Sequence, residues 1–99
     1  MPGRAEYHPE AVSEIRHAAS WYDEQVKGLG LDFLLEVRSA EFRILEHPEA
    51  RPDYEDGTKR CIMQKFPFAV VYQVSKEAIQ IVAVAHCKRK PGYWKDRIS

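Results

Sequence analysis

The chain has 99 residues, of which 44% are hydrophobic and 30% are charged, with a formal net charge of zero. A chain this short buries one modest core, so we expect a single domain spanning residues 1–99. No apolar run approaches the roughly 20 residues that cross a bilayer, and the first residues lack the apolar stretch of a signal peptide. The composition therefore argues against a membrane protein, and we expect the protein in the cytoplasm.

The zero net charge hides two oppositely charged halves. Residues 1–56 carry six Lys and Arg against thirteen Asp and Glu, a net charge of −7, whereas residues 57–99 carry nine against two, a net charge of +7. A basic region of this kind can bind phosphates or an acidic protein surface even when the whole chain is neutral.

The cysteines and histidines are not spaced as metal ligands. Cys61 and Cys87 lie far apart, and the four histidines are scattered along the chain. Structural metal sites need closely spaced Cys or His pairs, and neither a glycine-rich phosphate loop nor a nucleophile-elbow motif is present. We therefore expect no metal and no other cofactor, with both cysteines kept as thiols.

The first predicted elements are a short strand over residues 4–7 and a helix over residues 9–26. Pro9 suits the first turn of a helix, because the N–H that proline lacks would be unpaired there. Apolar residues then recur every three or four positions, which places them on one face. They are Ala11, Ile15, Ala18, Tyr22 and Val26, widened by Val12 and Ala19. The opposite face is expected to carry Glu10, Glu14, Asp23 and Glu24.

A second helix is predicted after the break at residues 27–30. Its apolar stripe is formed by Phe33, Val37, Ala40 and Ile44, supported by Leu34 and Leu45. It ends before Pro48. Two helices joined by so short a break are expected to form an antiparallel hairpin, and each then has an apolar stripe that another part of the chain must cover.

Three strands follow a polar, turn-rich segment at residues 49–57. They are predicted over residues 58–65, 68–74 and 78–85. The connections between them are short, so we expect an antiparallel meander. The predicted fold is α+β, in the order β-α-α-β-β-β: a short N-terminal strand, a helical hairpin packed on one face of a small antiparallel sheet, and a basic C-terminal tail.

The last two strands are almost continuously apolar, which indicates that both faces of the sheet are at least partly covered. The helical hairpin can cover only one face. We therefore expect the second face to be partly exposed in the isolated chain and normally masked by a partner.

The tail from His86 to Arg97 interleaves cations with aromatic residues, since it reads His-Cys-Lys-Arg-Lys-Pro-Gly-Tyr-Trp-Lys-Asp-Arg. Lys and Arg pair with phosphates and aromatic rings stack on unpaired bases, so the tail fits nucleic acid. It also fits an acidic protein groove. Two structural alternatives remain open: His86 bonding the backbone or the tail, and Tyr93 with Trp94 folding back to cap the core.

Metal-free cleavage of RNA requires a base for the 2′-hydroxyl, cations for the phosphate and an acid for the leaving oxygen. The candidate catalytic set is Lys65, His86, Arg89 and Tyr93, with Arg60 as a further cation. If the tail binds a protein instead, the candidate contact residues are Arg60, Lys88, Arg89, Lys90, Tyr93, Trp94 and Arg97.

The order of elements resembles the RelE/ParE toxin superfamily over essentially the whole chain. The segments that carry the resemblance are Trp21-Tyr22-Asp23-Glu24, Leu29-Gly30 with Phe33-Leu34, Phe66-Pro67-Phe68 with Val71-Tyr72, and His86 with Arg89-Lys90-Pro91-Gly92-Tyr93-Trp94. These segments look like those of ParE-like "plasmid stabilisation" proteins.

The resemblance implies a toxin of a bacterial type II toxin-antitoxin system that is silenced by a cognate antitoxin and contacts DNA only through that antitoxin. ParE-like members poison DNA gyrase and are not known as nucleases, whereas RelE-like members are metal-independent endoribonucleases that cut messenger RNA on the ribosome. Overall neutrality and the tail favour the ParE-like branch. The RelE-like activity and a non-toxic protein-binding module on the same fold are the alternatives.

Overall fold

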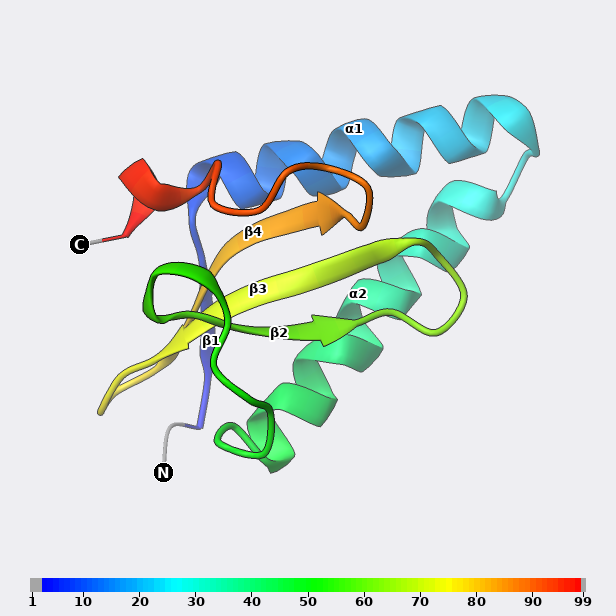
Figure 1. Cartoon of the computed structure of the whole chain (residues 1–99). Helices are drawn as coiled ribbons and strands as arrows, with labels where there is room; N and C mark the ends of the chain where they lie inside the picture. The colour runs from blue at the N-terminus through cyan, green and yellow to red at the C-terminus, as the bar shows by residue number, and fades with distance from the viewer. Residues whose placement is uncertain (1–2, 99) are drawn as a thin grey trace.

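The computed structural model describes residues 3–98 and shows the predicted order of elements (Figure 1). The strands and helices are β1 (Ala5–Tyr7), α1 (Pro9–Gln25), α2 (Leu29–Glu46), β2 (Lys59–Ile62), β3 (Phe68–Val74) and β4 (Ile79–His86), with short 3-10 turns at Glu55–Gly57 and Lys95–Arg97. The α+β fold with a helical hairpin before a three-stranded meander is thereby confirmed.

The sheet has the strand order β1-β4-β3-β2. The three strands of the meander pair in antiparallel fashion, as predicted. β1 adds a parallel neighbour to β4, with Ala5 opposite Ile79 and Tyr7 opposite Ile81, so the complete sheet is mixed. This pairing is possible because the helical hairpin returns the chain to the starting end of the sheet, as a parallel connection requires.

The hairpin turn explains where the helices begin and end. α1 begins at Pro9, where the His8 imidazole accepts a hydrogen bond from the Glu10 N–H at 3.1 Å. Gly28 adopts a left-handed conformation, with φ of 92°, and α2 begins immediately after it, before the apolar pattern resumes at Phe33.

Neither helix in the described part of the chain is long and apolar enough to cross a membrane.

The core between the hairpin and the sheet contains the predicted stripe of α2: Phe33, Val37, Ala40 and Ile44 are all buried. From α1, Ala11 and Ala18 are buried and Tyr22 packs against Phe33, Phe66 and Phe68. The predictions for Val26 and Leu34 are wrong, because Val26 follows α1 and both side chains are exposed.

β2 is shorter than the predicted strand over residues 58–65. The backbone N–H groups of Gln64 and Lys65 donate to the Glu36 carboxylate, each at 3.1 Å, and therefore leave the ladder. Glu36 is itself buried on α2 between core residues. A buried carboxylate thus ends the strand and anchors the following turn to the hairpin.

The expectation that a partner masks the second face of the sheet is wrong, because the chain covers much of that face itself. Trp94 is only 2% exposed and packs with Val71, Val82, Ala83 and Ala85. Tyr54, Tyr93 and Ile98 pack against the same cluster. The apolar pattern of the strands correctly indicated two covered faces, but the tail supplies the second cover.

Candidate functional site

The basic tail is held against α1 and β4 by one carboxylate. Glu14 accepts hydrogen bonds from the Val84 N–H at 2.9 Å, the Tyr93 hydroxyl at 2.7 Å and the Arg97 guanidinium at 3.0 Å. Arg97 also donates to the Val82 carbonyl at 3.0 Å, and its side chain is only 9% exposed. Because both charged groups lie largely out of water, each depends on the other for stabilisation.

Tyr93 and Arg89 belong to the same network. Burial of the phenol, followed by its hydrogen bond to Glu14, raises the pKa of Tyr93 well above its ordinary value. Its one hydroxyl proton is already donated to Glu14. The Arg89 guanidinium stacks on the Tyr93 ring, 3.5 Å from the centroid, and lies 3.7 Å from a Glu14 oxygen. Arg89 is half exposed, so it is the member of this network that another molecule can reach.

His86 makes local structural contacts. Its Nδ1 accepts a hydrogen bond from the Lys88 N–H at 3.1 Å, and its ring lies edge-on to Phe68 with 5.2 Å between centroids. The structural alternative, in which His86 bonds the tail backbone, is thus the arrangement in the structure. Lys88 and Lys90, the neighbouring cations of the tail, are exposed.

The candidate catalytic residues are only partly brought together. Arg60, His86 and Arg89 border a small cavity over Trp94, with a volume of about 10 Å³. Arg60 stacks on the Tyr54 ring at 4.3 Å. Lys65 does not line this cavity; it lies exposed in the turn between β2 and β3. A space of this size holds about one water molecule, so it does not accommodate a nucleotide base.

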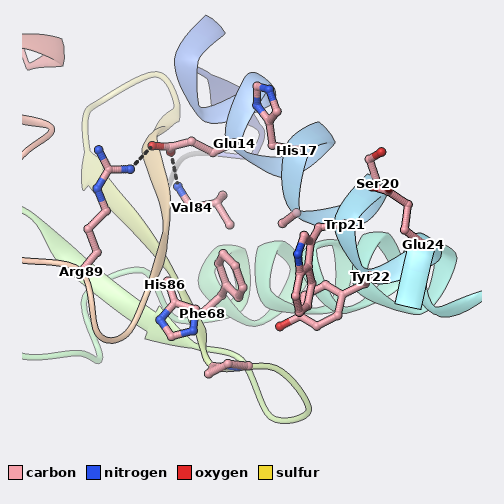
Figure 2. A pocket seen from close by; sticks show the side chains of 12 residues that line it. Glu14, His17, Ser20, Trp21, Tyr22, Glu24, Phe68, Val84, His86 and Arg89 are labelled. Atoms are coloured by element: carbon pink, nitrogen blue, oxygen red, sulfur yellow. Dashed lines mark hydrogen bonds and ion pairs between the residues drawn. The ribbon is translucent and has the colours of Figure 1, made fainter. Parts of the chain in front are cut away.

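A much larger groove, of about 920 Å³, lies between α1 and the adjoining ends of β3 and β4 (Figure 2). Its lining residues are Glu14, His17, Ala18, Ser20, Trp21, Tyr22, Glu24, Pro67, Phe68, Val84, His86 and Arg89. The groove and the tail network share Glu14 and Arg89, which Figure 2 shows at one end, with Trp21 and Tyr22 at the other.

The groove has an aromatic floor and charged rims. Trp21 lies edge-on to Tyr22, with 5.1 Å between ring centroids, and is 57% exposed. His86 and Arg89 stand on one side, and the exposed Glu24 stands on α1. An apolar trough between polar rims is the form that receives the apolar face of an amphipathic helix. Within residues 3–98, no three His, Cys, Asp or Glu side chains are grouped so that they could hold a metal ion.

Of the predicted contact residues, Trp94 lies in the core and Arg97 is nearly buried, so neither presents its side chain to a partner in this structure. Sequence reasoning missed Glu14, which it placed on the exposed face of α1. Its spacing contained a signal, because Ala11, Glu14, Ala18 and Trp21 follow one another at intervals of three, four and three, which is one helical face.

Comparison with known proteins identifies the family. The family described as "ParE toxin of type II toxin-antitoxin system, parDE" matches residues 5–91. A chain of the solved structure "Chromosomal ParDE TA system from P. aeruginosa" superposes with a TM-score of 0.74 at 14% sequence identity, covering 84% of this chain and 94% of that chain. No curated protein matches. The chain belongs to the ParE toxin family of type II toxin-antitoxin systems.

Proposed function

We propose that this toxin acts in the cytoplasm on DNA gyrase rather than on RNA, and that a cognate antitoxin neutralises it. The observation that carries the choice of target is the network around Glu14. It engages the hydroxyl of Tyr93, a member of the candidate catalytic set that a nuclease would need free. A tail used in this way supports folding and leaves its exposed cations for contacts with a protein.

The remaining surface of the tail is consistent with a protein target. Lys88, Arg89 and Lys90 are exposed at the end of β4, beside the larger groove. They offer charge, but they do not enclose a space that excludes water and orients a phosphate. Metal-free cleavage requires such a space. We therefore assign Lys88, Arg89 and Lys90 to target or antitoxin contact.

Expression without antitoxin, with parallel measurement of DNA and protein synthesis, tests this proposal. DNA synthesis is expected to fall first, with DNA-damage signalling, while messenger RNA stays full length. A decline of protein synthesis before DNA synthesis would contradict the gyrase assignment. Growth that continues normally, with folded toxin present, would favour the non-toxic binding module.

The RelE-like alternative has one observation in its favour: Arg60, His86 and Arg89 line one cavity. If the protein cuts messenger RNA on the ribosome, His86→Ala or Arg89→Ala should abolish both cleavage and toxicity, and transcripts should be shortened near translated codons. Full-length transcripts during growth arrest would eliminate this alternative.

We propose further that the antitoxin places an amphipathic helix in the groove between α1 and the sheet. The exposed Trp21 offers a large apolar contact, and Arg89 offers a partner for an acidic residue of that helix. Trp21 is the exposed tryptophan in the groove, whereas the other tryptophan, Trp94, is buried.

Titration with the cognate antitoxin tests this site. Trp21→Ala is expected to weaken binding by at least tenfold, because truncating an interface tryptophan typically costs about 2 kcal/mol or more. Ile62→Ala is the matched control, since Ile62 is similarly exposed but lies on the edge strand β2. Equal effects of the two substitutions would place the antitoxin elsewhere.

A further inference from the structure

α2 has a second apolar face that the fold leaves uncovered. Its inner stripe lies in the core, but Leu31, Leu34, Leu35 and Phe42 are between 43% and 60% exposed. These are four of the seven large exposed hydrophobic residues in residues 3–98. They do not line the groove beside α1. The largest apolar patch on a typical monomer covers about 300 to 600 Å² and is often an interaction surface.

The spacing of this outer face is that of a coiled-coil seam. Leu31, Leu35, Arg38 and Phe42 follow at intervals of four, three and four, the a and d spacing along which one helix packs against another. α2 has 18 residues and is therefore about 27 Å long. Arg38 is the one charged position of the seam, and its guanidinium lies 5.7 Å from the centroid of the Phe42 ring.

The charges beside the seam select the kind of partner. Asp32 and Glu46 are exposed along one edge, seven residues on either side of Ser39. In an antiparallel pair of two copies this edge would meet itself and bring Asp32 near Glu46 of the other copy. In a parallel pair the two Arg38 side chains would share one layer. Both arrangements juxtapose like charges, which disfavours a second copy of the chain.

The size of the surface leads to the same conclusion. Four half-exposed side chains of this kind present on the order of 400 Å² of apolar surface. A stable two-protein interface typically takes about 800 Å² from each partner. The seam alone is therefore about half of what a lasting homodimer needs, but it is sufficient as one of several contacts made by a larger partner.

We infer that the outer face of α2 is a second docking surface, separate from the groove, and that it receives a helix of another protein. That helix carries leucine-like residues at coiled-coil spacing, basic residues along the edge that meets Asp32 and Glu46, and an acidic residue in the layer of Arg38. Because the two surfaces share no residue, both can be occupied at once.

Two synthetic 18-residue helices test this inference with the full-length protein. Both have leucines at the seam positions and one central glutamate; one has lysines along its edges and the other has glutamates. Fluorescence anisotropy should show at least tenfold tighter binding of the lysine peptide, because opposite charges replace like charges at two positions. The Asp32→Lys/Glu46→Lys variant should reverse this preference.

Two control variants distinguish binding at the seam from nonspecific hydrophobic binding. Leu35→Glu, with its fold checked by circular dichroism, should weaken the lysine peptide at least tenfold, whereas Trp21→Ala in the groove should leave it unchanged. Equal affinity for both peptides, or insensitivity to Leu35→Glu, would overturn the inference. So would sedimentation that shows a wild-type dimer and a Leu35→Glu monomer, because the occupant would then be a second copy.

Discussion

The two faces of the sheet are covered by different means. The hairpin face is packed with periodic apolar residues from both helices, together with an aromatic cluster around Phe33. The other face is covered by one large residue, Trp94, and by a polar network in which Glu14 restrains Tyr93 and Arg97. Packing on the first face defines the fold. Packing on the second face restrains the basic tail, which contains the candidate catalytic residues His86, Arg89 and Tyr93.

This difference indicates why a basic, aromatic tail need not be an active site. Aromatic residues at the end of a small domain provide apolar area that its short strands lack, and cations near them can neutralise a carboxylate on a neighbouring helix. In this structure the Tyr93 hydroxyl and the Arg97 guanidinium make contacts of this kind with Glu14.

The largest expected effect is on the hairpin face. Phe33→Ala removes a fully buried ring from the main core and should lower the free energy of unfolding by about 4 kcal/mol. Chemical denaturation measures this loss. A loss below about 1 kcal/mol would mean that the hairpin contributes less to stability than its burial indicates.

Trp94→Ala should cost about 3 kcal/mol and should loosen the tail before the rest of the molecule. Hydrogen exchange is expected to accelerate in the tail and in the β4 residues below it, with α2 still protected. The indole N–H is buried without a hydrogen-bond partner among the described residues. Trp94→Phe therefore removes an unpaired donor and should cost about 1 kcal/mol. Uniform acceleration along the chain would contradict a separately held tail.

Glu14→Gln should destabilise the protein by about 2 kcal/mol, because it leaves the nearly buried Arg97 guanidinium without its closest counter-charge. Glu10→Gln is the matched control: Glu10 is 3.7 Å from the same guanidinium but is exposed. It should cost less than about 0.5 kcal/mol. Equal losses would show that Glu14 has no special position in the network.

The smallest effect concerns alkaline pH. Burial and hydrogen bonds to Glu41 and Glu14 raise the pKa of Tyr7 and of Tyr93 above the ordinary value of about 10. Their contribution to stability is present below pH 10 and falls above it, because the unfolded chain then loses tyrosine protons that the folded chain retains.

Denaturation at pH 9 and pH 11 tests this sign, since stability should fall between the two. Tyr93→Phe should cost about 1 kcal/mol at pH 9 and should make the decline toward pH 11 shallower. An unchanged decline would indicate that Tyr93 ionises at its ordinary pKa.

Local patterns predicted most of the fold. Helical spacing located both helices and the inner stripe of α2, and β3 was predicted with the bounds that the structure shows, because these features depend on neighbours in the sequence. The parallel pairing of β1 with β4 and the early end of β2 at Glu36 depend on residues far apart, so local patterns could not supply them.

The site was harder to predict for the same reason. The sequence indicated a basic, aromatic tail but could not show that Glu14, 79 residues before Tyr93, would bind it. It left Trp94 between a contact surface and a cap on the core, because a tryptophan beyond the last strand has no local pattern that would mark it as buried; the structure shows the second arrangement. The groove is also formed by distant segments, so local patterns did not predict it.

The most direct test of the central claim is a DNA supercoiling assay with purified gyrase and the refolded toxin, in parallel with ribosome-bound messenger RNA. We expect supercoiling to fall in proportion to added toxin, to recover on addition of the antitoxin, and to be inhibited equally by the His86→Ala variant, while the messenger stays intact. Undiminished supercoiling together with cleaved messenger would contradict the account and make the tail a nuclease site.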